Sequence, residues 1–147
     1  MNNKVMFSSK KEDWETPQDF FDKLNEEFHF TLDAAASLEN AKCANYFTKE
    51  QDGLAKSWGG QVVWLNPPYG RYTTGLWVKK AYEEHQRTGC TVVMLLPART
   101  DTIWFHNYIL GKAEIRFVKG RLKFGGGKDP APFPSLVAIM KKGKNND

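Results

Sequence analysis

The stretch Val62-Val63-Trp64-Leu65-Asn66-Pro67-Pro68-Tyr69 joins a buried strand to a rigid loop, and it decides the fold class. Its first four residues form a continuous apolar run of strand length, which is typical of a parallel strand covered on both faces. The run stops at Asn66 and two successive prolines, which fix φ and remove two backbone donors. Ligands of parallel α/β sheets bind at the carboxyl ends of the strands, so this loop is expected at a ligand site.

Helix and strand signals alternate on either side of this stretch. Before it, Thr16 and Pro17 have the features of a helix start, with Thr16 as the cap and Pro17 in the first turn. Apolar runs and turn residues predict the other elements: a strand at 30–33, a short strand near 46–47, a turn at 52–53, helices over 74–87 and 101–110, and strands over 91–96, 113–118, 121–124 and 135–140. This order predicts an α/β fold, with a mainly parallel sheet and an antiparallel C-terminal edge.

The length of the chain allows one compact domain. With 147 residues and 41% hydrophobic content, it can bury one core but has no room for two independent ones. We expect this domain to span residues 14–140. The polar ends are expected to form a flexible N-terminal segment over 1–13 and a disordered tail over 141–147.

Charge and cysteine content narrow the classes of partner and compartment. Lys and Arg number 21 against 17 Asp and Glu, which gives a net charge of +4 and fits a polyanionic partner without requiring one. Cys43 and Cys90 have neither disulfide-scaffold nor metal-site spacing, and the three histidines are scattered, so we predict no metal site. No apolar run approaches the length of a membrane span, and a reduced, cytoplasmic chain is expected.

The loop at Asn66 offers hydrogen-bond acceptors in a fixed arrangement. The Asn66 side-chain oxygen and the Pro67 carbonyl could accept both hydrogens of an aromatic amino group. This would favour a pyramidal nitrogen and stabilise the positive charge that develops during attack on a methylsulfonium. Pro68 stiffens the loop, and Tyr69 would stack on an extruded base. The alternative is an ordinary surface turn, because Asn and Pro are common turn formers.

Several motifs, in order along the chain, resemble the phage-type DNA N-6-adenine methyltransferase family, often called Dam-like. The resemblance implies a single-domain, Rossmann-like methyltransferase fold, S-adenosylmethionine as the methyl donor and adenine in DNA as the acceptor. The motifs are Asp13-Trp14-Glu15-Thr16-Pro17, Leu32-Asp33-Ala34-Ala35-Ala36-Ser37, Trp64-Leu65-Asn66-Pro67-Pro68-Tyr69, Pro97-Ala98-Arg99-Thr100-Asp101-Thr102 and Gly120-Arg121-Leu122-Lys123-Phe124.

The expected cofactor segment departs from the glycine-rich loop that is usual in methyltransferases. The chain has Asp33, followed by Ala34, Ala35 and other small residues, where that loop would lie. Small side chains still allow close approach of a backbone to the methionine portion, and Asp33 could hold its ammonium group. The alternative is an alanine-rich helix start capped by Asp33.

Two further segments are assigned to the cofactor through the family resemblance. Trp14, Thr16 and Pro17 resemble the segment that closes over the methionine end in related enzymes, although a capping signal with a buried Trp explains them too. Asp52 and Leu54 resemble the stretch that receives the cofactor's adenine, and an ordinary Asp-Gly turn is an equally good explanation.

Four basic residues are candidates for contacts with DNA phosphates, although each could also be an ordinary solvated charge. They are Arg99, Arg121, Lys123 and Lys128. The residues leave other functions open, because the same loop would serve cytosine N4, RNA adenine or protein glutamine. A non-catalytic DNA-binding module of the same fold is a further alternative.

Overall fold

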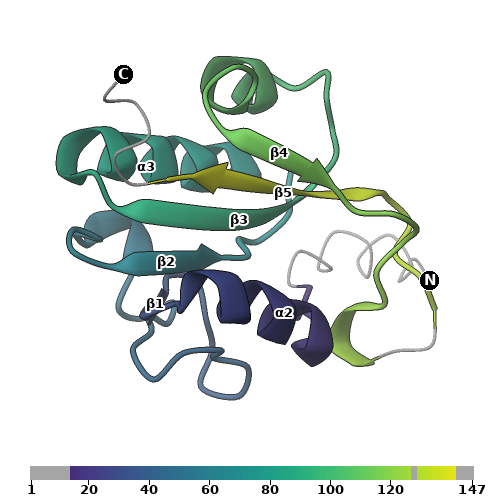
Figure 1. Cartoon of the computed structure of the whole chain (residues 1–147), viewed down its shortest axis with the longest axis horizontal. Helices are drawn as coiled ribbons and strands as arrows, with labels where there is room; N and C mark the ends of the chain where they lie inside the picture. The colour runs from purple at the N-terminus through teal and green to yellow at the C-terminus, as the bar shows by residue number, and fades with distance from the viewer. Residues whose placement is uncertain (1–13, 127–128, 142–147) are drawn as a thin grey trace, which may run out of the picture.

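The computed structural model describes residues 14–126 and 129–141 and contains a five-stranded mixed sheet in the order β1-β2-β3-β5-β4 (Figure 1). The pairs β1–β2 and β2–β3 are parallel, whereas β5 is antiparallel to both β3 and β4. The sheet is therefore mainly parallel, as predicted, but the one strand that runs against the others is β5, which lies between β3 and β4 and not at the edge. The strands are β1 (Leu32–Asp33), β2 (Val62–Leu65), β3 (Thr91–Pro97), β4 (Glu114–Phe117) and β5 (Ser135–Met140).

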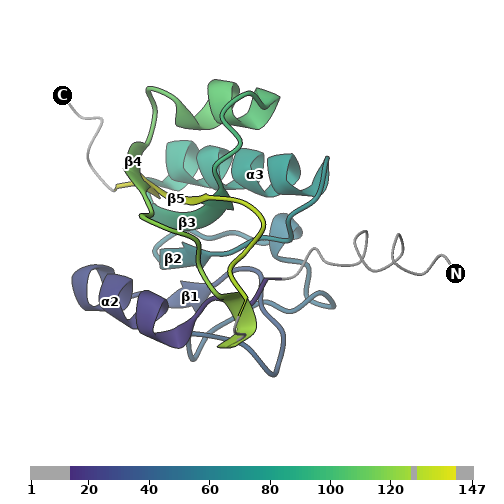
Figure 2. The same ribbon diagram turned by 90° about the vertical axis from the view of Figure 1, so that its right-hand side faces the viewer.

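Helical segments cover both faces of the sheet, as Figure 2 shows from the side. Helix α2 (Gln18–Phe28) packs Phe21 and Leu24 against Trp64 of β2. Helix α3 (Thr73–Thr88) lies on the other face, in the cluster that contains Val63 and Leu65. Successive residues of β2 thus point to opposite faces, and all but the half-buried Val62 are buried, which confirms the prediction of a strand covered on both sides.

The strongest apolar patterns located their elements to within a residue. The predicted helix at 74–87 is one residue longer at each end, and β5 has the bounds predicted for it. The short strand predicted near 46–47 exists as one parallel bridge between Asp33 and Tyr46.

One predicted element is wrong in type, and another is shorter than predicted. Residues 121–124 form no strand, because the Leu122 carbonyl accepts the Ala131 N–H and the chain then enters the short turn η3 (Phe124–Gly126). The helix predicted over 101–110 is reduced to a brief helical segment whose main part is the π-helix η2 (Phe105–Ile109). Its start is set by Thr102, whose hydroxyl accepts the Phe105 N–H.

The predicted ends of the chain, 1–13 and 141–147, lie outside the described residues except for Lys141. Within the described part of the chain, no helix is both long and apolar enough to cross a membrane.

A close backbone contact fixes the turn predicted at 52–53. Asp52 has φ 56°, and the short helix η1 (Gly53–Ala55) follows it. Gly53 lies so close to β1 that an added Cβ would meet the Ala34 carbonyl oxygen at 2.3 Å. The Gly53 carbonyl also accepts the indole N–H of the buried Trp58 at 3.0 Å. This contact holds the 52–55 turn against the end of β1.

We expect Gly53→Ala to lower the free energy of unfolding by about 1–3 kcal/mol, because the added methyl group must displace the Ala34 backbone. Urea unfolding followed by circular dichroism measures the loss. Gly59→Ala is the matched control, because a Cβ there meets side chains and no backbone, those of Thr88 at 3.2 Å and Ser57 at 3.5 Å. Equal midpoints for Gly53→Ala and the wild type would contradict the close contact.

Candidate active site

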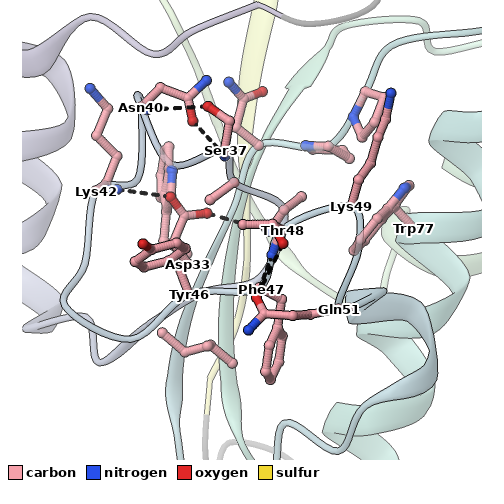
Figure 3. Close-up of a pocket in the computed structure, with 18 of the residues that line it drawn as sticks. Asp33, Ser37, Asn40, Lys42, Tyr46, Phe47, Thr48, Lys49, Gln51 and Trp77 are labelled. Carbon is pink, nitrogen blue, oxygen red and sulfur yellow. Dashed lines mark hydrogen bonds between the residues drawn. The ribbon is translucent and has the colours of Figure 1, made fainter.

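The parallel strands β1 and β2 bring Asp33 and Asn66 to the same edge of the sheet. Asp33 is the last residue of β1, and Asn66 directly follows β2. Both line an open cavity of about 1590 Å³ (Figure 3). The other walls come from the segment before α2, the irregular stretch 35–54 and the start of α3. The two residues, which the sequence analysis assigned to the cofactor segment and to the acceptor loop, therefore border one cavity.

The Asn66 amide is held in one orientation. Its nitrogen donates to the Trp14 carbonyl and to the Thr16 hydroxyl oxygen, the latter at 3.0 Å. A carbonyl can only accept, so the amide nitrogen must face Trp14 and the oxygen must face the other way. That oxygen is buried and has no hydrogen-bond partner among the described residues. An unsatisfied buried acceptor costs about 1–3 kcal/mol, which an incoming N–H donor would recover.

Thr16 serves this amide and does not cap a helix. Helix α2 begins at Gln18 with Pro17 in the capping position, and no side-chain hydrogen bond caps it. The prediction of Thr16 as the helix cap is therefore wrong. Its hydroxyl is buried against Asn66, which is 50 residues away in sequence.

Asp33 presents a buried carboxylate to the cavity. Its oxygens accept the backbone N–H groups of Lys42 at 3.0 Å and Ala35 at 3.4 Å. Burial raises the pKa of Asp33 to about 6, although these two hydrogen bonds and the Lys42 charge oppose the shift. Burial, with a contribution from the Asp33 charge, raises the pKa of the neighbouring Cys43 thiol to about 12.

The stretch after Asp33 forms no helix over residues 34–52, so the alternative of a helix start capped by Asp33 is wrong. Ala35 lines the cavity, whereas Ala34 is fully buried behind it. Asp52 and Leu54 line the same cavity, together with Trp77 of α3, which the sequence analysis did not select. Trp77 followed a helical pattern typical of core residues, so no local signal marked it.

The segment before α2 contributes only part of what the sequence predicts. Trp14 and Thr16 line the cavity beside Asn66. Pro17 does not line it and instead lines a second cavity on the other side of this segment.

Only part of the loop after β2 borders the cavity. Pro67 and Pro68 line the cavity, and the Pro68 carbonyl accepts the Thr74 hydroxyl at 3.1 Å. Tyr69 does not line it. The Tyr69 hydroxyl donates to the Leu95 carbonyl at 2.8 Å, and burial raises its pKa well above the ordinary value.

An aromatic cover surrounds Tyr69. The Phe124 and Phe133 rings lie edge-on to it, with centroids 6.3 and 5.6 Å away. Trp14 packs edge-on against the same two rings. In this conformation the Tyr69 ring is closed off from an incoming base.

The second cavity, of about 880 Å³, lies between the start of α2 and residues 121–125. Basic residues outnumber acidic ones in its wall, and it shares Glu15, Thr16 and Lys42 with the first cavity. Its charged residues are Glu15, Asp19, Lys23, Lys42, Arg121 and Lys123.

The four predicted DNA contacts are therefore only partly brought together. Arg121 and Lys123 share the second cavity, and Arg121 also donates to the Ala131 carbonyl. Arg99 is exposed and lies over the Phe133 ring, 6.0 Å from its centroid. Lys128 lies outside the described residues. No cluster of His, Cys, Asp and Glu that could hold a metal occurs within residues 14–126 and 129–141.

Comparison with known proteins gives one family. The family described as DNA N-6-adenine-methyltransferase (Dam) matches residues 4–146. The chain is 38% identical over 111 residues to the DNA N-6-adenine-methyltransferase of Escherichia phage T1, a match covering 74% of this chain and 45% of the phage protein. It is 40% identical over 63 residues to the protein YfdM of Escherichia coli (strain K12), which covers 38% of this chain and 69% of that protein. The matched part thus spans less than half of the phage T1 relative.

The Asp33 carboxyl should make folding stability depend on pH. Its pKa of about 6 in the folded protein exceeds the ordinary 3.8, so the folded state holds the proton more tightly than the unfolded chain. The stability from this group is complete below the unfolded pKa and is lost as the pH rises through the folded pKa. Between about pH 4 and pH 7, the wild type should lose about 2 kcal/mol more than Asp33→Asn.

Urea unfolding across that pH range measures this difference, with Asp101→Asn at an exposed position as the control. A wild-type curve parallel to that of Asp33→Asn would show that the carboxyl titrates alike in the folded and unfolded states.

Proposed function

The chain belongs to the DNA N-6-adenine-methyltransferase (Dam) family, and on this premise we propose that it methylates the exocyclic N6 amino group of adenine in DNA. The resemblance found in its motifs is thereby confirmed. We further assign its mixed α/β sheet to the Rossmann-like methyltransferase fold. The observation that carries the proposal is the buried Asn66 side-chain oxygen, which has no partner among the described residues although its amide borders the cavity.

The proposed chemistry rests on hydrogen-bond acceptance by the loop after β2. An aromatic amine is a poor nucleophile, because its lone pair is delocalised into the ring. The Asn66 oxygen accepts one N6 hydrogen and the Pro67 carbonyl accepts the other, which favours a pyramidal nitrogen with a localised lone pair. These acceptors are fixed before the substrate arrives, so they stabilise the positive charge that develops on nitrogen without reorganising.

The residues that line the large cavity suit the chemical groups of S-adenosylmethionine. When bound, this cofactor supplies a methylsulfonium as the source of the methyl group. The buried Asp33 carboxylate suits its ammonium group, and apolar Leu54 and Trp77 suit its adenine ring. Asp52 is assigned to the adenine amino group and Trp14 to the methionine end. Thr16 contributes by orienting Asn66, and buried Ala34 supports the wall from behind.

The role predicted for Tyr69, stacking on an extruded adenine, requires a change of conformation. Its ring is enclosed by Phe124 and Phe133, which do not line the cavity. We propose that these rings move aside when the base enters. Enclosure of the ring in the absence of DNA keeps a large aromatic surface out of water.

The second cavity is the proposed path of the DNA backbone. Lys23, Arg121 and Lys123 line it, and it adjoins the large cavity through Glu15 and Thr16. A phosphate in this groove would lie beside the segment that holds Asn66. Arg99 and Lys128 are proposed as additional phosphate contacts. The reaction would take place where DNA is found, in the cytoplasm of a bacterial or phage-infected cell.

The purified protein should transfer a labelled methyl group from S-adenosylmethionine to DNA and yield N6-methyladenine. Asn66→Ala should slow transfer by about 10²–10³, because it removes one preorganised hydrogen-bond acceptor. Mass spectrometry of digested DNA identifies the product, and a filter assay gives the rate.

Asn107→Ala is the matched control, because Asn107 is exposed on η2 and should be replaceable at full activity. A product consisting only of N4-methylcytosine would show that the acceptor base is cytosine and not adenine. Wild-type turnover by folded Asn66→Ala would show that the loop has a purely structural role.

Replacing Arg121 and Lys123 together by Ala should weaken DNA binding and flatten its salt dependence. Each lost phosphate contact reduces the slope of log affinity against log salt by about 0.9. Fluorescence anisotropy with labelled duplex DNA at several salt concentrations measures both effects. The double variant Lys79→Ala/Lys112→Ala removes the same charge from outside the second cavity. An equal reduction in both double variants would argue against the groove as the DNA site.

A further inference from the structure

Lys42 is a buried cation that neither the sequence motifs nor the proposed mechanism uses. It lies in the irregular stretch between β1 and β2, and its side chain is only 7% exposed. Its ammonium group donates to the Gln18 side-chain oxygen at 2.9 Å and lies 4.0 Å from the Glu15 carboxylate. These are its two side-chain partners among the described residues.

This arrangement gives the Lys42 ammonium group no ion pair closer than 4.0 Å among the described residues. Lys side chains are seldom buried unless they are closely paired with an anion. The Glu15 carboxylate lies at the outer limit of an ion pair, and 48% of its side chain is exposed to solvent. An ammonium group has three donors, so Lys42 retains capacity for a closer anionic ligand.

Lys42 lies next to the carboxylate that borders the large cavity. Its backbone N–H donates to an Asp33 oxygen at 3.0 Å, so the acid and the base belong to one hydrogen-bonded unit. Figure 3 draws both residues in the wall of this cavity. The wall of one cavity thus contains a buried acid, Asp33, and a base, Lys42, whose ammonium group lies toward Gln18 and Glu15. An α-amino acid group has the complementary pair of charges, an ammonium and a carboxylate on one carbon atom.

We propose that Lys42 binds the carboxylate of the methionine portion of S-adenosylmethionine, while Asp33 binds its ammonium group. This inference rests on the proposed function, because it assigns a residue to the cofactor of that reaction. The other walls of the cavity accommodate the nucleoside. Lys42 would make binding depend on the carboxylate of the methionine portion. The charge-assisted hydrogen bond from the cofactor carboxylate would also replace water that burial removes from the Lys42 ammonium group.

A cofactor carboxylate fits Lys42 better than a DNA phosphate does, although Lys42 also borders the second cavity. A phosphate within a DNA strand is bulky and remains near solvent, whereas the Lys42 side chain is more than nine-tenths buried. Exposed Lys23 and Lys123, on the same groove, are more accessible to a DNA strand.

The test compares two ligands that differ in one group. Isothermal titration calorimetry measures the affinity of the full chain for S-adenosylmethionine and for decarboxylated S-adenosylmethionine, without DNA. The wild type should prefer the carboxylated ligand by about 10- to 100-fold, as expected for one charge-assisted hydrogen bond. Lys42→Met should bring this preference close to one, and Lys42→Arg should retain part of it. Lys79→Met, at an exposed position of α3, is the matched control and should keep the full preference.

Several outcomes would overturn the inference. A wild-type preference in Lys42→Met would do so, and so would an equal weakening of both ligands, which is expected if Lys42 only ties the 33–47 stretch to Gln18. Loss of DNA affinity with an unchanged ligand preference would identify Lys42 as a phosphate contact instead. If Lys42→Met fails to fold in a thermal unfolding control, the Lys42→Arg preference decides the question, and a wild-type value would count against the inference. Failure of the wild type to bind either ligand would overturn the proposed function itself, and this inference with it.

Discussion

The side-chain amide of Asn66 connects the two parts of the chain that form the site. Its nitrogen binds the Trp14 carbonyl and the Thr16 hydroxyl, which draws the segment before α2 across the end of β2. Both cavities have this segment as a common wall. The same two bonds point the amide oxygen away from Trp14 and leave it without a partner among the described residues. The two hydrogen bonds of the Asn66 amide nitrogen therefore shape the site and orient the amide oxygen that is proposed as the acceptor.

The stretch between β1 and β2 has little regular secondary structure, yet it holds the Asp33 carboxylate in a buried position. The Asp33 backbone accepts from Phe47 and donates to Asn45, so the stretch folds back onto the end of β1. Its side chain then binds the N–H groups of Ala35 and Lys42. Burial of the carboxylate raises its pKa to about 6, which is a cost to the folded protein near neutral pH. A cationic ligand would offset that cost. The energetic cost of burying the Asp33 carboxylate thus lies at a position where ligand binding can relieve it.

Residues 121–125 link the aromatic cover to the basic groove. Arg121 and Lys123 line the second cavity, and Phe124 of the same segment packs against Tyr69. The Gly125 N–H donates to the Glu15 carbonyl, which ties residues 121–125 to the segment before α2. A displacement of these residues would therefore alter the groove and the cover of Tyr69 together. Direct contacts connect the proposed binding of DNA and the proposed entry of the base.

The sequence by itself determined the strands and the rigid loop, because apolar runs and proline act locally. Val62–Leu65, Ser135–Met140 and the helix after the loop were predictable in this way, and parallel pairing then placed Asp33 beside Asn66. Only the tertiary structure decided that Thr16 orients Asn66, that Tyr69 is enclosed and that Lys42 is buried. Each of these depends on segments far apart in sequence coming into contact, and no local pattern encodes which side chain will meet which.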